Sequence, residues 1–406
     1  MNVLFRVACA FPVDQSPIVD AGLWVVNNAI KAIAPWQELK QSTSAKKTIE
    51  LKDHVITPGF VNCHAHLELT ALRGKIPFKK NFLDWAALIM DQRRKWSRSD
   101  LKKSTQEGLE ELINSGCTTV ADYSSEGLSY NTVKQSGIRG IGFYELIQFD
   151  PAQFSNEKEK IKKFISQKVS HRFRRGIAVH APYSVHPYLI KWCFRQKASP
   201  LSIHLSELKE EVEFVEKNPV NNIFRKIREQ RPAWLKEWKV PGVSPVRYLE
   251  NLGAKNYTAV HLNYLRSGDV ESLKRRSATA VYCPLSHQFF SHSRHPLLKL
   301  RKGGVIVGLG TDSCASNLRC DMREEMCAVK QTYKSLKDSD ILSMATLEGA
   351  TALNMDKDIG SLTVGKKADV IFFKMSSDPK TILKNIVSQR PEVSAIMCDG
   401  KWVKAI

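Results

Sequence analysis

Short apolar and β-branched runs alternate with longer amphipathic stretches through the middle of the chain. Between the runs, stretches such as Ser99–Ser115 and Glu157–Lys168 place apolar residues three and four positions apart, which is typical of surface helices. Strands that alternate with helices in this way favour a closed parallel barrel over an open sheet. The pattern therefore predicts an α/β fold of the (β/α)8 TIM-barrel type. The eight expected strands are 55–62, 117–122, 138–146, 176–179, 201–204, 258–261, 278–283 and 305–309.

The two ends of the chain have a different pattern. Met1–Ile49 and Gly360–Ile406 contain short alternating strands separated by turn residues such as Asn27 and Gly400. We expect these ends to join in one small β-sandwich domain beside the barrel. The predicted domains are a composite sandwich of residues 1–54 and 355–406 and a barrel of residues 55–354.

Composition sets broad limits on the class of protein. A chain of 406 residues that is 43% hydrophobic can bury a large core. Its apolar runs are strand-sized, so no membrane span is expected. The stretch Val7–Phe11 is too short for a secretory signal and is predicted to be a first strand. Nine cysteines without a C-x-x-C pair indicate neither a disulfide framework nor a zinc ribbon, and a cytoplasmic location is expected.

The formal net charge of +20 raises the question of an anionic partner. Lysine and arginine are scattered from Arg6 to Lys404 and are mixed with acidic residues, without a basic stripe interleaved with aromatic residues. We therefore expect a small-molecule substrate and neither nucleic acid nor membrane as a partner. A preference for an anionic substrate remains open, as does a homodimer.

Polar residues stand at or just after the ends of the expected strands. In a (β/α)8 barrel these positions converge on the C-terminal face, where active sites lie. The sequence therefore predicts an active site there. The residues are His64, His66, Glu145, His180, His204, Glu207, His261, Ser286, His287 and Asp312.

Several of these residues form a candidate metal site. His64 and His66 are two apart in extended backbone, so both imidazoles point the same way and can bind one ion. A single histidine after a strand is usually a hydrogen-bonded core residue, and Asp312 could cap a helix. Nitrogen and carboxylate donors from four strand ends together favour a zinc or iron site.

Three motifs carry a resemblance to the amidohydrolase superfamily. They are PGFVNCHAH at 58–66, SIHLSE at 202–207 and GLGTDS at 308–313, and the segment 359–369 is similar to the closing segment of that superfamily. Within it, the chain resembles the branch that deaminates adenine, guanine and related rings. The resemblance implies one divalent ion, zinc or iron, held by His64, His66, His204 and Asp312. Binuclear members carry a carboxylated lysine where this chain has His180.

The resemblance also implies a mechanism. A divalent ion lowers the pKa of a coordinated water toward about 7. Asp312 would take the water proton, His261 would orient the water, and Glu207 would donate a proton to a ring nitrogen. These three residues are the expected catalytic groups. A cytidine-deaminase site is not expected, because no P-C-x-x-C motif accompanies the H-x-E spacing of His66 and Glu68.

Three local features concern the substrate. Asp84, in a Leu-Asp-Trp segment, resembles the position that holds ribose hydroxyls in related nucleoside deaminases, although an ordinary helix cap is the alternative. His180 matches a substrate-side histidine of the same relatives. The segment 283–290, with Ser286 and His287, and the segment 66–69 resemble aminodeoxyfutalosine deaminases of the alternative menaquinone pathway.

Such a substrate is an adenine nucleoside whose ribose carries an aromatic carboxylate, and Arg73 is a candidate partner for that anion. Methylthioadenosine, S-adenosylhomocysteine and guanine are the alternatives. A catalytically silent scaffold is disfavoured because every ligand position is filled. Residues 217–242 form either a lid over the site or a surface insertion.

Overall fold

The computed structural model describes residues 1–78, 81–125, 127–196, 200–229, 239–375 and 378–405. Eight parallel strands pair in chain order, and an isolated bridge between Ala65 and Asp312 links the first of them to the segment after the last. The predicted TIM barrel is therefore confirmed. Its strands are β5 (Phe60–Ala65), β6 (Cys117–Ser125), β7 (Arg139–Leu146), β8 (Phe173–Val179), β9 (Leu201–Leu205), β10 (Thr258–His261), β11 (Thr279–Tyr282) and β12 (Val307–Leu309).

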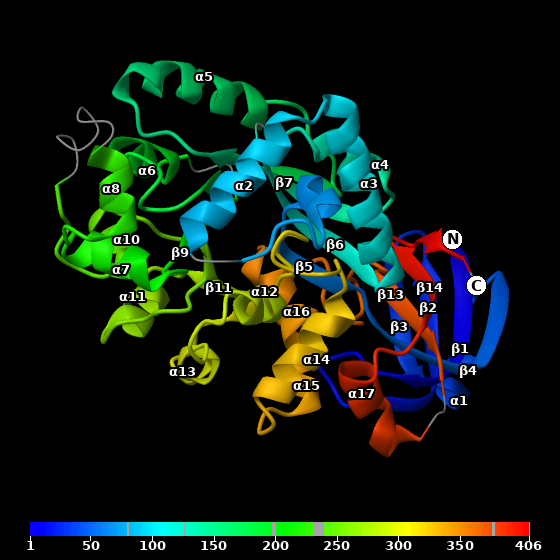
Figure 1. Cartoon of the computed structure of the whole chain (residues 1–406). Coiled ribbons are helices and arrows are strands. Elements are labelled where there is room, and N and C mark those ends of the chain that lie inside the picture. The colour runs from blue at the N-terminus through cyan, green and yellow to red at the C-terminus, as the bar shows by residue number, and fades with distance from the viewer. Residues whose placement is uncertain (79–80, 126, 197–199, 230–238, 376–377, 406) are drawn as a thin grey trace.

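Helices surround the barrel and cover its mouth (Figure 1). Helix α3 begins with a capping box between Ser97 and Asp100 and buries Leu109 and Leu112. The principal barrel helices are η1 (Leu67–Leu72), α2 (Phe82–Arg94), α3 (Arg98–Asn114), α4 (Tyr130–Gln135), η2 (Pro151–Gln153), α5 (Phe154–Ile165), α6 (Pro187–Cys193), α7 (Lys209–Glu216), α8 (Ile223–Glu229), α10 (Pro245–Asn251), α11 (Asp269–Arg275), α12 (Pro284–Phe289), α13 (Leu297–Lys302), α14 (Met322–Thr332), α15 (Asp338–Met344) and α16 (Leu347–Ala352).

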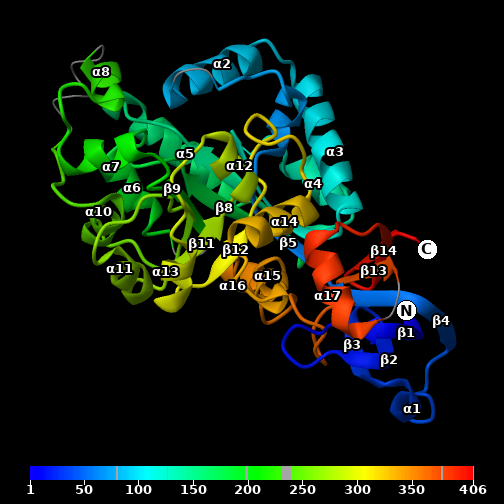
Figure 2. The same ribbon diagram turned by 60° about the horizontal axis from the view of Figure 1, so that its bottom comes forward.

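The two ends of the chain meet in a seven-stranded mixed sheet beside the barrel (Figure 2). Its core packs Phe5 against Phe372 and Trp402. The predicted association of both termini in one β-rich unit is confirmed. In sheet order the strands are β15 (Lys401–Lys404), β14 (Val393–Cys398), β13 (Val370–Lys374), β4 (Lys47–Pro58), β1 (Asn2–Ala10), β2 (Ile18–Val26) and β3 (Ala29–Pro35), with α1 (Trp36–Leu39) and α17 (Pro379–Ser388) alongside.

The run 55–62 is not one barrel strand, and that prediction was wrong. Strand β4 stays in the terminal sheet to Pro58, and β5 begins at Phe60. The chain passes between the two sheets at Gly59, where a Cβ atom would lie 2.0 Å from Thr118 Oγ1. Only glycine permits this approach, so one apolar run continues through two different sheets.

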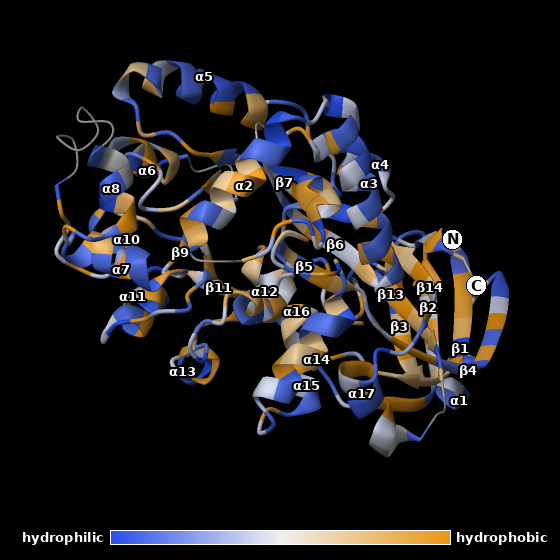
Figure 3. Ribbon diagram, in the orientation of Figure 1, coloured by the Kyte–Doolittle hydropathy of each residue, from blue (hydrophilic) through white to orange (hydrophobic). Residues whose placement is uncertain are grey.

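The pattern of hydropathy follows the layers. Figure 3 shows hydrophobic residues along the strands and many polar residues on outer helices such as α5. Helix α5 buries Ile161 and Phe164 against the barrel, and Lys162 and Lys163 are exposed. Among the described residues, no helix is long and apolar enough to cross a bilayer.

Candidate active site

A cavity of about 560 Å³ lies at the carboxyl ends of the barrel strands. His66, His204, His261 and Asp312 contribute to its floor. Helix α2 supplies one wall, and Phe149, Tyr183 and Phe224 contribute to another. A volume of this size is in the usual range for a small-molecule site. Residues 230–238 of the expected lid segment lie outside the described part of the chain.

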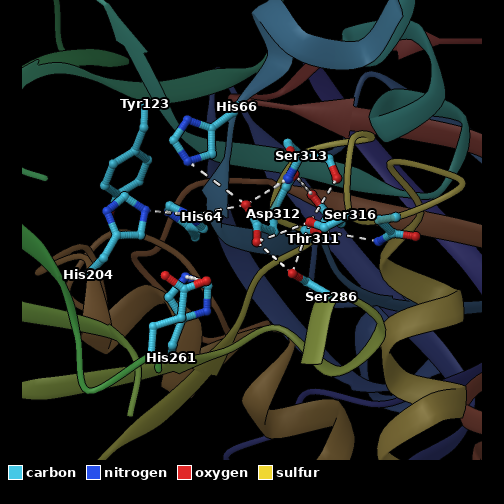
Figure 4. Close-up of polar contacts among 12 residues, drawn as sticks. His64, His66, Tyr123, His204, His261, Ser286, Thr311, Asp312, Ser313 and Ser316 are labelled. Carbon is cyan, nitrogen blue, oxygen red and sulfur yellow. Dashed lines mark hydrogen bonds and ion pairs between the residues drawn. The ribbon is translucent and has the colours of Figure 1, made fainter. Parts of the chain in front are cut away.

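The two histidines of the H-x-H motif face the aspartate that follows β12. His64 Nε2 lies 3.5 Å from Asp312 Oδ1, and His66 Nε2 lies 3.8 Å from the same oxygen. Figure 4 shows these side chains around Asp312. Gly310 permits the approach, because a Cβ there would lie 2.8 Å from His64 Cβ.

The side chain of His204 completes the cluster from β9. Its Nε2 lies 3.3 Å from His64 Nε2, while its Nδ1 lies 2.9 Å from the carbonyl oxygen of His180. Donation from Nδ1 to that carbonyl fixes the tautomer and leaves the Nε2 lone pair free, as metal-binding histidines require. Nitrogens of His64, His204 and His261 also lie within 4.8 Å of one another.

Burial controls the charges of the cluster. Burial lowers the pKa of His64 to about 4, although Asp312 acts in the opposite direction. Burial also holds the pKa of His204 and of His261 well below the usual value. For His66, burial is outweighed by the carboxylates of Glu145 and Asp312, and its pKa is raised. His64, His204 and His261 are therefore neutral donors at physiological pH.

The carboxylate of Asp312 is held from several sides. Ser286 Oγ donates to its Oδ2 at 2.7 Å, Ser316 Oγ donates to the same oxygen at 3.3 Å, and the Ser313 N–H donates to Oδ1 at 2.8 Å. Burial alone would raise the pKa of Asp312, but the contact with His64 and the nearby imidazoles hold it well below the usual range. Asp312 is therefore an anion that faces the histidines.

The donor set fits a divalent metal. Two ligand atoms at about 2.0 to 2.1 Å from a tetrahedral metal are about 3.3 to 3.4 Å apart. The observed distances of 3.3 and 3.5 Å from His64 Nε2 to His204 Nε2 and Asp312 Oδ1 match that spacing. The free lone pair of His204 Nε2 and the anionic oxygen of Asp312 are donors that a divalent zinc or iron ion accepts. His64, His66, His204 and Asp312 would hold it, as the sequence predicts.

Glu207 lies beside this set at the start of the β9–α7 connection. Its Oε1 is 3.7 Å from His261 Nε2. Burial, and then the charges of Asp312 and Glu211, raise the pKa of Glu207 well above the usual value. A carboxyl group with a raised pKa holds its proton more readily than an exposed one, and it can donate that proton to a ligand in the cavity.

The backbone around these side chains is strained. Ser206 has a φ of 51°, His261 of 76°, Leu262 of 54° and Asp312 of 58°, and none of them is glycine. Such left-handed residues cluster at functional sites, where surrounding bonds hold them in place. Here the Leu262 N–H donates to the Leu205 carbonyl at 3.0 Å, and the Asp312 N–H donates to the His64 carbonyl at 3.0 Å.

The predicted substrate residues are distributed differently. His180 lines the cavity, and its Nδ1 lies 2.6 Å from Ser184 Oγ. Asp84 is exposed in the first turn of α2 and accepts a hydrogen bond from Asn81 Nδ2 at 2.8 Å, outside the cavity lining. Ser286 bonds to Asp312, and His287 is buried against His295. The substrate roles of all four stay predictions.

The sequence interpretation placed Glu145 at the active face but gave it no role, and it did not single out Glu211. Glu145, at the end of β7, lines the cavity, and its carboxylate lies within 4.8 Å of nitrogens of His66 and His204. Glu211 accepts hydrogen bonds from the Ser206 and Glu207 N–H groups at 2.9 and 3.0 Å, so it fixes the backbone under Glu207. The strand-end position of Glu145 and the four-residue spacing of Glu211 from Glu207 were the available signals.

One metal ion per chain is the expected content of the purified protein. The four expected ligands fall in two overlapping groups that share His64, and the resemblance to the superfamily implies that His180 stands where binuclear members carry a bridging lysine. Elemental analysis after dialysis is expected to give about one equivalent of zinc or iron. Two tightly bound equivalents would contradict the single-ion site.

Comparison with known proteins agrees with this geometry. Residues 55–403 match the model of the amidohydrolase family. The 5-methylthioadenosine/S-adenosylhomocysteine deaminase of Carboxydothermus hydrogenoformans is 26% identical over 429 aligned positions, which cover 99% of this chain and 93% of that enzyme.

Two solved structures share the fold at lower identity. The aminofutalosine deaminase of Helicobacter pylori, solved with methylthio-coformycin, has a TM-score of 0.85 and 22% identity over 98% of this chain and 99% of its own. A zinc-bound adenosine deaminase of Xanthomonas campestris has a TM-score of 0.84 and 23% identity over 99% and 92%. The family match spans most of the chain, so this protein belongs to the amidohydrolase family and groups with the deaminases of that family.

Proposed function

We propose that this chain is a metal-dependent hydrolytic deaminase of an adenine nucleoside, and that the nucleoside is 6-amino-6-deoxyfutalosine, an intermediate of menaquinone biosynthesis. The observation that carries the deaminase proposal is the buried Glu207 carboxyl group, 3.7 Å from His261 and beside the metal-ligand set. This arrangement supports the assignment of Glu207 as the proton donor beside the position where water would attack the ring. The cavity of about 560 Å³ is large enough for a nucleoside.

The side chains have separate tasks in the proposed reaction. Glu207 donates its proton to the ring nitrogen beside the amino-bearing carbon, which makes that carbon electrophilic. His261 orients the attacking water, and Asp312 accepts a proton from it. A divalent metal held by the ligand set supplies the Lewis acid that lowers the pKa of water. The new carbon–oxygen bond then replaces the carbon–nitrogen bond. The ring nitrogen keeps the proton from Glu207, one water proton reaches the amino group, which leaves as ammonia, and the other water proton restores Glu207.

A second substrate class has support of its own. The relative from Carboxydothermus hydrogenoformans is named for 5-methylthioadenosine and S-adenosylhomocysteine, and it aligns with 99% of this chain. These compounds share the adenine nucleoside with 6-amino-6-deoxyfutalosine and differ in the group attached to the ribose. The choice among them therefore depends on the outer part of the cavity and not on the metal site.

The test is ammonia release by the purified, metal-loaded protein. The substrates are 6-amino-6-deoxyfutalosine, 5′-methylthioadenosine, S-adenosylhomocysteine, adenosine and guanine, at equal concentrations. The proposal expects the highest kcat/KM for 6-amino-6-deoxyfutalosine and little activity on guanine. A higher value for methylthioadenosine or S-adenosylhomocysteine would select the second class, and guanine as the best substrate would contradict the nucleoside proposal.

A further inference from the structure

The walls of the cavity carry very little positive charge. Among the described residues that line it, Arg93 is the one lysine or arginine. Arg73, the candidate anion partner from the sequence, lies outside the lining. Its Nη2 is 2.6 Å from Glu111 Oε1 and 3.8 Å from Cys314 Sγ, so it is already engaged. An anionic group on a ligand in this cavity therefore has Arg93 as its available cation.

Arg93 stands at the end of a mainly apolar strip on helix α2. Phe82, Trp85, Ile89 and Arg93 all line the cavity, and their spacing of three and four residues places them on one face of the helix. The helix crosses the mouth of the barrel (Figure 1). Arg93 stands eight positions after Trp85, which corresponds to about 12 Å along the axis. A ligand extended along α2 would contact both the apolar side chains and the guanidinium.

A buried acid orients the Arg93 side chain. Arg93 Nε donates to Glu68 Oε1 at 3.1 Å, and the Ser125 N–H donates to the same oxygen at 3.4 Å. The Glu68 side chain is 5% exposed, whereas that of Arg93 is 29% exposed. Within the described parts of the chain, neither terminal nitrogen of Arg93 has a hydrogen-bond partner. The contact through Nε thus fixes the guanidinium and leaves its outer edge free.

We infer that Arg93 is a specificity-determining residue that binds a carboxylate at the far end of the nucleoside substituent. The inference rests on the proposed function and narrows its substrate class to adenine nucleosides whose ribose carries an apolar or aromatic group ending in a carboxylate. The apolar strip of α2 packs against that group, and the two terminal nitrogens of Arg93 form a fork that matches two carboxylate oxygens.

The neighbouring charge of Glu68 determines how Arg93 distinguishes a carboxylate substituent from a neutral one. Glu68 offsets the charge of the guanidinium, so long-range attraction of an anion is weak. Recognition then depends on short, directed hydrogen bonds, which lysine cannot reproduce with a single ammonium group. A neutral substituent such as methylthio makes no use of the fork, and its binding is expected to be independent of Arg93.

The experiment compares two substrates in matched variants. Arg93→Gln is expected to raise the KM for 6-amino-6-deoxyfutalosine by about 10- to 100-fold. Its kcat should change little, and the KM for neutral 5′-methylthioadenosine should change less than about twofold. The control is Arg94→Gln, because Arg94 is the next residue, has the same charge, is 72% exposed and lies outside the lining. Arg93→Lys should recover only part of the lost affinity. Metal content and thermal unfolding confirm that each variant folds.

Each remaining outcome is decisive. An unchanged KM for the carboxylate substrate in Arg93→Gln overturns the assignment of Arg93. The proposed function still stands in that case if the wild-type protein releases ammonia from this substrate. If both Arg93→Gln and Arg93→Lys raise the KM equally for the two substrates, Arg93 supports the folding of α2. That result also overturns its assignment as a carboxylate-binding residue. Wild-type protein that releases ammonia from neither nucleoside contradicts the proposed function itself.

Discussion

Glu207→Gln is expected to keep its metal and to lose turnover by at least about 100- to 10,000-fold. Glutamine has nearly the same shape as the protonated acid, so the contacts around β9 should persist. Its amide cannot deliver a proton to the ring nitrogen, however, and it cannot pass one to the leaving amino group. Burial raises the pKa of Glu207 well above the usual value, which is consistent with a group that acts in its protonated form.

The measurement is the steady-state rate of ammonia release together with the metal content of the same sample. Glu210→Gln is the matched control, since Glu210 lies three residues further on and is exposed at the start of α7. Its turnover should equal that of the wild type. Near-normal activity of Glu207→Gln at full metal occupancy would remove Glu207 from the mechanism.

Asp312→Asn is expected to lose both the metal and the activity. Asparagine replaces the anionic oxygen that faces His64 and His66 with a neutral amide, and one of its two terminal atoms is a donor that cannot bind a cation. Turnover should fall by at least about 100- to 10,000-fold, because the proton acceptor is lost as well. Metal content should fall well below one equivalent, which distinguishes this variant from Glu207→Gln.

Asp358→Asn serves as the control for this change, because Asp358 is exposed on the segment after α16. Metal titration with a competing chelator measures the affinity of each variant. Full metal occupancy in Asp312→Asn would show that the three histidines suffice, and Asp312 would then be only a proton acceptor.

The local pattern of the sequence was sufficient to predict the barrel and to collect candidate metal donors at its carboxyl end, while the choice of four ligands rested on the resemblance to the amidohydrolase superfamily and stays a prediction. Strand residues alternate in direction with a period of two, so His64-Ala65-His66 identifies two ligands from spacing alone. His204, His261 and Asp312 are added as candidate donors by their positions after strands, because all parallel strand ends meet at one face. These arguments need no knowledge of distances between distant segments.

The walls of the cavity could not be predicted in the same way. Arg93 lines it because α2 crosses the mouth at one angle, and no local spacing encodes that angle. Ser286 and His287 are adjacent in sequence, yet one turn of α12 directs the first to Asp312 and the second to His295. The strand break at Gly59 was hidden because apolar residues suit both sheets equally well.

The bridge between Ala65 and Asp312 places the metal site at the junction that closes the barrel. It lies where the first and last barrel strands meet, and β12 has only three residues, so few backbone hydrogen bonds join the two edges there. His64 and His66 belong to one edge of this junction, and Asp312 belongs to the other. An ion bound by all three would hold the first and last strands of the barrel together. Metal binding would then close the barrel and form the active site in the same step. Loss of the ion would then loosen the fold first at this junction.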